Sequence, residues 1–201
     1  MTKIKFCGLT RLSDIQAANT LLPDYIGFVF AQKSKRYVDI QTASSLKKNL
    51  RANIKSVGVF VNEKIDNIIK MLNLNIIDVI QLHGTENKLY IKELRNFTDK
   101  IIIQAFKIQS RDDVLKASES LADYVLLDSG NGTGKTFNWD ILASMNFKRD
   151  YFLAGGLNPE NVSLAIQILK PFAVDVSSGI ESNSLKDISK MSAFISNVRK
   201  L

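Results

Sequence analysis

The sequence predicts an α/β protein folded as a single-domain (β/α)8 TIM barrel over residues 1–201. Three observations predict this fold class. Short apolar runs rich in Ile, Val, Phe and Tyr alternate with amphipathic stretches of helical spacing. The links between them are short, which is typical of a parallel sheet with helices packed outside it. The alternation gives eight strand and helix units and ends in a helix, which favours a closed barrel over an open doubly wound sheet with its usual five or six strands, roughly.

The predicted strands are short and rich in β-branched and aromatic residues. With 201 residues the chain lies at the small end of the range for such barrels, about 200 to over 400 residues, so there is little room for a second domain. In chain order the predicted strands are Lys3–Phe6, Tyr25–Phe30, Lys55–Val61, Ile76–Gln81, Lys100–Phe106, Tyr124–Leu127, Tyr151–Ala154 and Phe172–Val176.

Each strand is followed by a predicted helix. In the first of these helices Ile15, Ala18 and Leu22 recur at helical spacing. In the seventh, Asn158 precedes Pro159, which predicts an N-cap followed by proline at the first helical position. The predicted helices are Ser13–Leu22, Ile40–Leu50, Glu63–Leu72, Glu86–Asn96, Ser110–Ser120, Trp139–Ser144, Asn158–Leu169 and Leu185–Val198.

The composition excludes several classes of protein. Its 45% hydrophobic and 23% charged residues are ordinary for a globular protein with one sizeable core. A single cysteine excludes an internal disulfide framework, and no apolar run is long enough for a bilayer span or a signal peptide. We therefore expect a cytoplasmic protein with no membrane partner. The sequence does not decide whether it is a monomer or a homodimer.

The net charge of +7 is compatible with two kinds of partner. A basic protein can bind nucleic acid, but the same charge suits an enzyme of anionic small molecules. The lysines are scattered over the predicted helices and are not massed in one stripe with aromatic residues. We therefore expect a small-molecule substrate and no nucleic acid.

A glycine-rich loop follows Asp128 at the end of the sixth predicted strand. Its Gly134-Lys135-Thr136 resembles the end of a phosphate-binding G-x-x-x-x-G-K-[ST] loop, but Ser129 occupies the place of the first glycine. The G-x-G-x-x-G dinucleotide pattern fails in the same loop. The loop therefore predicts a cover beside a catalytic carboxylate, with a turn-capping role as the alternative for Asp128.

Active sites in barrels of this kind use the carboxyl ends of the strands. Cys7 ends the first predicted strand, where it is a candidate base or a small buried hydrophobic residue. Lys5 should share its face of the strand, and a nearby ammonium group would favour the thiolate over the thiol. Asp128 would be the complementary acid.

Two further side chains at strand ends are candidates for binding. His83 follows the fourth strand and suits ligand binding, proton transfer or a structural role. Arg36 follows the second strand and could form a bidentate pair with a carboxylate or be one more surface charge. Cys7 and His83 alone do not make a metal-binding set, so we expect no metal.

Small residues follow the seventh and eighth predicted strands. Gly155 and Gly156 in one loop, and Ser177, Ser178 and Gly179 in the other, would let a ligand approach backbone N–H groups, with a helix start behind them. Loops at these two places are the usual phosphate site of such barrels, so we expect a phosphorylated substrate. The alternative is that these glycines only close tight turns.

Several motifs together resemble the phosphoribosylanthranilate isomerase family of tryptophan biosynthesis, through nearly the whole chain. The first is Lys5-Phe6-Cys7-Gly8-Leu9-Thr10, similar to the family's K-I-C-G-[LI]-T opening. The others are Gly27–Phe30 with Ser34-x-Arg36-x-Val38, Val57–Asn62, Gln81–Gly84, Gly132–Trp139, Leu153–Val162 and Val174–Glu181.

The resemblance implies a cofactor-free and metal-free Amadori rearrangement of N-(5-phosphoribosyl)anthranilate to 1-(2-carboxyphenylamino)-1-deoxyribulose 5-phosphate. It implies that Asp128 is the general acid that protonates the furanose ring oxygen. It also implies that Cys7 is the general base that removes the C2′ proton, that Arg36 holds the anthranilate carboxylate, and that His83 lies nearby. The loops at 155–156 and 177–179 would take the phosphate.

Three other functions stay open. A histidine-pathway isomerase of an aminoaldose bisphosphate would need a carboxylate in place of Cys7 and a second phosphate site among the early loops. Indole-glycerol-phosphate synthase would bring more catalytic lysines and glutamates and an extra N-terminal segment, whereas this chain begins at its first strand. A nucleic-acid-binding domain would show affinity that falls steeply with salt and does not depend on Cys7 or Asp128.

Overall fold

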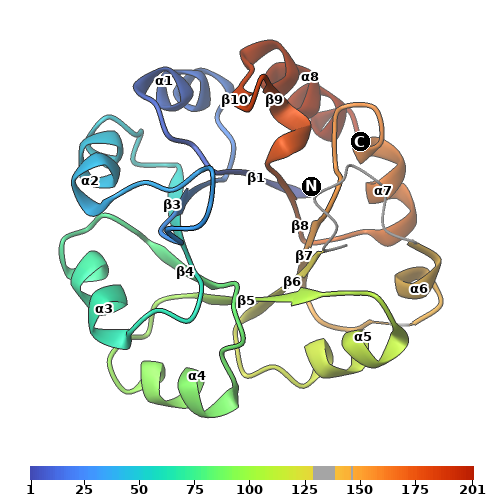
Figure 1. Cartoon of the computed structure of the whole chain (residues 1–201). Coiled ribbons are helices and arrows are strands. Elements are labelled where there is room, and N and C mark those ends of the chain that lie inside the picture. The colour runs from blue at the N-terminus through green and yellow to red at the C-terminus, as the bar shows by residue number, and fades with distance from the viewer. Residues whose placement is uncertain (129–138, 146) are drawn as a thin grey trace.

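A computed structural model of the chain describes residues 1–128, 139–145 and 147–201. Within these residues eight parallel strands close into a barrel, which confirms the fold class expected from the sequence. Figure 1 shows the strands as a closed ring viewed along the barrel axis. The strands are β1 (Lys3–Cys7), β2 (Tyr25–Val29), β3 (Lys55–Phe60), β4 (Val79–Leu82), β5 (Ile102–Lys107), β6 (Tyr124–Asp128), β7 (Tyr151–Ala154) and β8 (Ala173–Val176).

The helices form a second ring outside the strands (Figure 1). Their apolar faces pack against the outer faces of the strands in one continuous core. The helices are α1 (Leu12–Leu21), α2 (Ile40–Lys48), α3 (Ile65–Asn73), α4 (Lys88–Arg95), α5 (Arg111–Ser118), α6 (Trp139–Ala143), α7 (Val162–Leu169) and α8 (Ile188–Arg199).

The first and last strands of the barrel pair with each other. In this register Lys5 lies opposite Asp175 of β8 on one side and Tyr25 of β2 on the other. Side chains alternate along a strand, so Lys5 and Cys7 share the face that points into the barrel. The closure therefore places a cation and a carboxylate inside the barrel, below Cys7.

The two ends of the barrel interior are filled differently. At the amino ends of the strands, Tyr25, Tyr124, Phe152 and Phe172 contact one another, with ring centroids 4.7–5.8 Å apart. At the carboxyl ends the buried apolar cluster consists of smaller side chains, Cys7, Val29 and Val59. Bulky rings thus close one end of the barrel and leave room at the other.

Three predicted element boundaries are wrong by three residues or more. The fourth strand begins at Val79 and not at Ile76, because Asp78 turns the chain and accepts a hydrogen bond from the backbone N–H of Ser56. Helix α7 begins at Val162 and not at Asn158, because Asn158 and Asn161 exchange side-chain hydrogen bonds in a turn before it.

The third wrong boundary lies after β8. The segment predicted as the start of the last helix, at Leu185, forms β10 (Leu185–Lys186), which pairs with β9 (Glu181–Ser182). Helix α8 then begins at Ile188, where Asp187 caps the N-terminus through its side chain. A single 3-10 turn, η1 (Ser178–Ile180), precedes this small hairpin.

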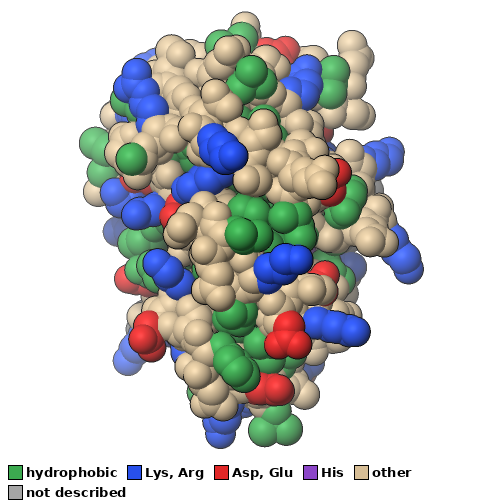
Figure 2. Space-filling model, turned by 90° about the vertical axis from the view of Figure 1, so that its left-hand side faces the viewer, with side chains coloured by type: hydrophobic (Ala, Val, Ile, Leu, Met, Phe, Trp, Pro, Cys, Tyr) green, Lys and Arg blue, Asp and Glu red, His purple; other side chains and the backbone are tan. Residues whose placement is uncertain are grey.

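Basic side chains are spread singly over the molecular face shown in Figure 2, among acidic and uncharged ones. This face shows no basic stripe of the kind that follows a nucleic-acid backbone. In the described part of the chain, none of the helices has the length and apolar character needed to cross a membrane.

Candidate active site

A pocket of about 560 Å³ opens at the carboxyl ends of the strands. Eight of the nine site residues expected from the sequence line it, although they come from six different strand ends. These are Cys7, Arg36, His83, Asp128, Gly155, Gly156, Ser177 and Ser178, whereas Gly179 does not line the pocket.

Cys7 lies at the floor of the pocket, above a buried ion pair. The Nζ atom of Lys5 is 2.9 Å from Oδ1 of Asp175, and the Lys5 side chain has no exposed surface. Burial lowers the pKa of Lys5, but Asp175 and Cys7 together offset that effect and raise the pKa above its ordinary value. Lys5 is therefore charged, and its charge acts on the neighbouring Cys7.

Lys5 has the expected effect on Cys7, but burial outweighs it. Lys5 does favour the thiolate, but burial of the thiol disfavours it more strongly, and the Asp175 carboxylate adds to that effect. The pKa of Cys7 is raised above its ordinary value, not lowered. The net direction of the shift could not be predicted, because a sequence shows the neighbouring cation but not the depth of the thiol or the opposing carboxylate.

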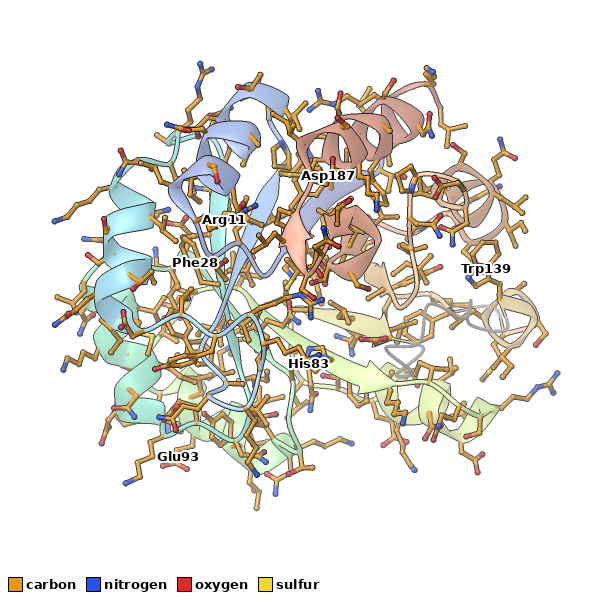
Figure 3. The ribbon with its side chains drawn as sticks, turned by 45° about the horizontal axis from the view of Figure 1, so that its top comes forward. Arg11, Phe28, His83, Glu93, Trp139 and Asp187 are labelled. Carbon is orange, nitrogen blue, oxygen red and sulfur yellow. The ribbon has the colours of Figure 1, made fainter. Side chains whose placement is uncertain are left out.

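His83 lies over the ring of strands, near the centre of the view in Figure 3. Its Nδ1 atom is 2.9 Å from the amide nitrogen of Gln81, which can only donate, so the neutral ring carries its proton on Nε2. Nε2 lies 3.9 Å from Oδ2 of Asp128. Burial lowers the pKa of His83, and the charge of Asp128 opposes this only in part. The site therefore presents a neutral imidazole beside the candidate acid.

Gln81 is a site residue that the sequence analysis did not single out. Its side chain is 1% exposed and lines the pocket, and its Oε1 has no hydrogen-bond partner among the described residues. A buried acceptor of this kind is costly unless a ligand or water satisfies it. Gln81 lies two residues before His83, so its side chain points to the same side of the chain. This spacing could have identified Gln81 as a site residue from the sequence.

Asp128 is the last residue of β6, and its side chain is about one quarter exposed (26%). The backbone fixes its place, because its C=O accepts a hydrogen bond from the N–H of Ile108. The glycine-rich loop predicted to cover the site, residues 129–138, lies outside the described residues.

The loops expected to hold phosphate both reach the pocket. Gly155 and Gly156 have φ values of 90° and 67°, a region that favours glycine. The expected helix start behind these two glycines is wrong, since α7 begins six positions later, at Val162. The loop after β8 leads instead into the single turn η1. Phosphate binding at these loops would therefore depend on backbone N–H groups and the Ser177 and Ser178 side chains.

Gly179 packs against the neighbouring loop and not into the pocket. A Cβ atom at this position would lie 1.9 Å from the backbone oxygen of Leu157. We expect Gly179→Ala to force the loops after β7 and β8 apart and to cost about 1–3 kcal/mol of stability. Urea unfolding and the KM for a phosphorylated substrate measure the two effects. An unchanged free energy of unfolding together with an unchanged KM would show that the close contact at Gly179 is not needed.

Arg36 lies at the pocket edge, paired with a residue that the sequence analysis did not single out. Its Nε and Nη2 atoms donate to Oε1 and Oε2 of Glu181, each at 2.7 Å. Lys186 donates to the same Oε1 at 2.6 Å. Burial alone would raise the pKa of Glu181, but the hydrogen bonds from Arg36 and Lys186 hold it below its ordinary value. No sequence pattern signalled this pair, because no strand was predicted at β9 and a helix was predicted from Leu185, where β10 forms.

The described residues contain no group of three or more His, Cys, Asp or Glu side chains placed to hold a metal ion. The pocket instead combines a thiol, a carboxylate, a neutral imidazole and a guanidinium group. These groups are suited to proton transfer on an anionic substrate.

Comparison with known proteins identifies the family. The family model of N-(5′-phosphoribosyl)anthranilate (PRA) isomerase matches residues 4–197. The N-(5′-phosphoribosyl)anthranilate isomerase of Clostridium kluyveri is 45% identical over 202 residues, covering 100% of both chains. The crystal structure of phosphoribosyl anthranilate isomerase from Thermotoga maritima superposes with a TM-score of 0.90 at 36% identity, covering 100% of both chains.

A second solved structure is that of a phosphoribosyl anthranilate isomerase in complex with reduced 1-(o-carboxyphenylamino)-1-deoxyribulose 5-phosphate. It is similar to this chain with a TM-score of 0.87 and 35% identity, again over 100% of both chains. The match of the family model and the full-length similarity to these relatives show that the chain belongs to the N-(5′-phosphoribosyl)anthranilate isomerase family.

Proposed function

We propose that this isomerase converts N-(5-phosphoribosyl)anthranilate to 1-(2-carboxyphenylamino)-1-deoxyribulose 5-phosphate, with Cys7 as general base and Asp128 as general acid. The observation that carries the proposal is the convergence of Cys7, Asp128 and Arg36 with both glycine and serine loops on one pocket. The substrate has a carboxylate, a phosphate and a sugar carbon that must lose a proton. The pocket offers a group of suitable chemistry for each.

The reaction begins with proton transfer to the ring oxygen. Asp128, in its protonated form, gives its proton to the furanose oxygen; the C1′–O bond breaks, and the anilino nitrogen supplies the electron pair for a Schiff base. Its place at the rim of the pocket gives it access to a ring oxygen of a bound sugar. The Nε2 atom of His83 lies 3.9 Å from Asp128, so His83 is near the carboxylate that forms.

The second transfer takes a proton from carbon. The Cys7 thiolate removes the C2′ proton, and the electron pair moves to form the C1′=C2′ bond of an enolamine, which tautomerises to the ketone. The Lys5 ammonium next to Cys7 stabilises the thiolate while it exists. Substrate and product are isomers, so no oxidant, reductant or cofactor is required.

Substrate binding would use the charged ends of the pocket. Arg36 would hold the anthranilate carboxylate, and the backbone around Gly155, Gly156 and Ser177–Gly179 would bind the phosphate, with Gly179 shaping its loop. A cytoplasmic location and a monomeric or homodimeric state stay predictions.

The direct test follows the fluorescence of phosphoribosylanthranilate generated in situ. We expect rapid decay of the fluorescence on addition of the protein. An unchanged signal, together with turnover of the histidine-pathway aminoaldose bisphosphate, would overturn the proposal in favour of that related isomerase. The nucleic-acid alternative predicts no turnover and salt-sensitive binding to an oligonucleotide.

The pH dependence of kcat/KM tests the role of Cys7. A base acts in its deprotonated form, so the rate should rise with pH through the pKa of Cys7 in the free enzyme. Because burial raises this pKa, we expect the midpoint of the rise above the ordinary thiol value of 9.0. Cys7→Ala, as the control, should lose this rise from its residual activity. A midpoint below neutral pH in the wild type would contradict the assignment.

A further inference from the structure

We propose that Glu181 is a positioning residue for substrate selection. It holds Arg36 so that the free edge of the Arg36 guanidinium group faces the pocket. This edge would bind the ring carboxylate of the substrate. The inference rests on the proposed role of Arg36 and goes beyond it, because it assigns the orientation of Arg36 to the hairpin after β8.

The hydrogen bonds define which edge of Arg36 is occupied. A guanidinium group has five N–H donors, and Glu181 takes one from Nε and one from Nη2. These two atoms form the side edge of the group. The remaining donors include one on each of Nη1 and Nη2, which point in parallel from the outer end and match a second carboxylate.

Glu181 approaches Arg36 from within the protein. Its side chain is 8% exposed and does not line the pocket, whereas Arg36 is 31% exposed and does. A glutamate that competed with the substrate for Arg36 would have to lie in the pocket itself. The geometry therefore points to support of Arg36 from behind.

Two lysines fix Glu181 in turn. The Nζ atom of Lys186 donates to Oε1 of Glu181 at 2.6 Å and to the backbone oxygen of Ser177 at 2.9 Å. Lys190 donates to the backbone oxygen of Glu181 at 2.7 Å. The pairing of β9 with β10 holds Glu181 directly opposite Lys186. Glu181 is thus anchored at both its backbone and its carboxylate.

The charges in this cluster leave one positive charge for the substrate. Arg36 and Lys186 carry two positive charges, and Glu181 carries one negative charge between them. A bound carboxylate would bring the cluster to neutrality. Without Glu181, two cations would lie close together, and the rotatable Arg36 side chain would have no partner to fix it.

The stem of Arg36 is held on its other side by Gly8. A Cβ atom at Gly8 would lie 2.4 Å from Cδ of Arg36. The Arg36 side chain therefore crosses the backbone at a residue that has no side chain. The guanidinium group is therefore fixed at its stem and along one edge. Only the outer edge is left to respond to a ligand.

The test compares two substrates in variants of Glu181. One is phosphoribosylanthranilate, and the other is the glycosylamine that forms from ribose 5-phosphate and aniline, which lacks the carboxylate. We expect Glu181→Ala to raise KM for the first substrate about tenfold, with kcat within about twofold, and to leave KM for the second unchanged. Glu181→Gln keeps one acceptor oxygen, so its KM should lie between those of wild type and Glu181→Ala.

Double variants separate positioning from general damage. In an Arg36→Ala background, Glu181→Ala should cause no further rise in KM, since there is nothing left to position. Glu181→Gln guards against misfolding, because it keeps the shape of the side chain beside Lys186. Its thermal midpoint is measured alongside KM.

Other outcomes would overturn the inference. Equal losses with both substrates would show that Glu181 only maintains the fold, and a lower KM in Glu181→Ala would show that it competes with the carboxylate. Unchanged KM in both Glu181 variants would show that Arg36 needs no support. Absence of wild-type turnover, or an Arg36→Ala variant with unchanged KM, would instead point to failure of the proposed function.

Discussion

Replacement of Asp128 with asparagine is expected to lower kcat/KM by about 10²–10⁴-fold, the usual contribution of a general acid or base. Asparagine has nearly the same shape as aspartic acid, but its amide has no acidic proton to give to the ring oxygen. The substrate should therefore bind with little change in KM while kcat falls. The fluorescence decay of phosphoribosylanthranilate measures both parameters in one experiment.

The matched control for this variant is Asp150→Asn. Asp150 precedes β7 at the opposite end of the barrel, so the same chemical change there should leave kcat and KM unchanged. If Asp128→Asn retained activity within about tenfold of the wild type, another group would have to protonate the sugar oxygen. A loss confined to KM would instead make Asp128 a binding residue.

Replacement of Lys5 with methionine is expected to lower the free energy of unfolding by about 3–5 kcal/mol, because it leaves the Asp175 carboxylate as an uncompensated charge inside the barrel. Urea unfolding measures the loss. The double variant Lys5→Met/Asp175→Asn removes both charges and should recover most of the stability. Equal stability of wild type and Lys5→Met would contradict the view that the pair is desolvated.

The same variant tests the link between Lys5 and the proposed base. The ammonium group of Lys5 lowers the pKa of Cys7, although burial raises it more. Its removal should therefore move the rising limb of the kcat/KM profile to still higher pH. A limb that stayed at the wild-type position would show that the charge of Lys5 does not act on the thiol.

The strand ends could be predicted from the sequence because the short apolar runs of the strands and the helical spacing between them were both clear. Cys7 and Asp128 each end an apolar run, and in a parallel barrel every such end reaches the same rim. Convergence on one pocket then follows from topology, without knowledge of any side-chain contact. For the same reason His83 and the loops after β7 and β8 reach the pocket.

The elements that were missed share a different cause. Leu185 and Ile188 continue a helical spacing, but Lys186 pairs in β10 so that its ammonium group can reach Glu181 and Ser177. Such tertiary hydrogen bonds leave no periodic trace in the sequence. For the same reason Glu181 could not be linked to Arg36, which lies 145 positions away.

The effect of burial was also beyond the sequence. Lys5 and Cys7 were correctly expected on one face of β1. The direction of the Cys7 pKa shift, however, depends on how deeply the thiol is buried and on Asp175 of the neighbouring strand β8. Both are properties of the closed barrel. Alternation within a single strand cannot supply them.

The pairing of β1 with β8 also constrains how this chain reaches its native state. Lys5 and Asp175 are 170 positions apart, so the ammonium group stays without its carboxylate until almost the entire chain has been synthesised. Long-range contacts of this kind form slowly, because the entropy of closing the intervening loop must be overcome first. The last strand therefore does more than complete a ring of hydrogen bonds. It brings the Asp175 carboxylate to the buried Lys5 ammonium group, so that Lys5, which lies beside the proposed base, gains its counter-charge only when the barrel closes.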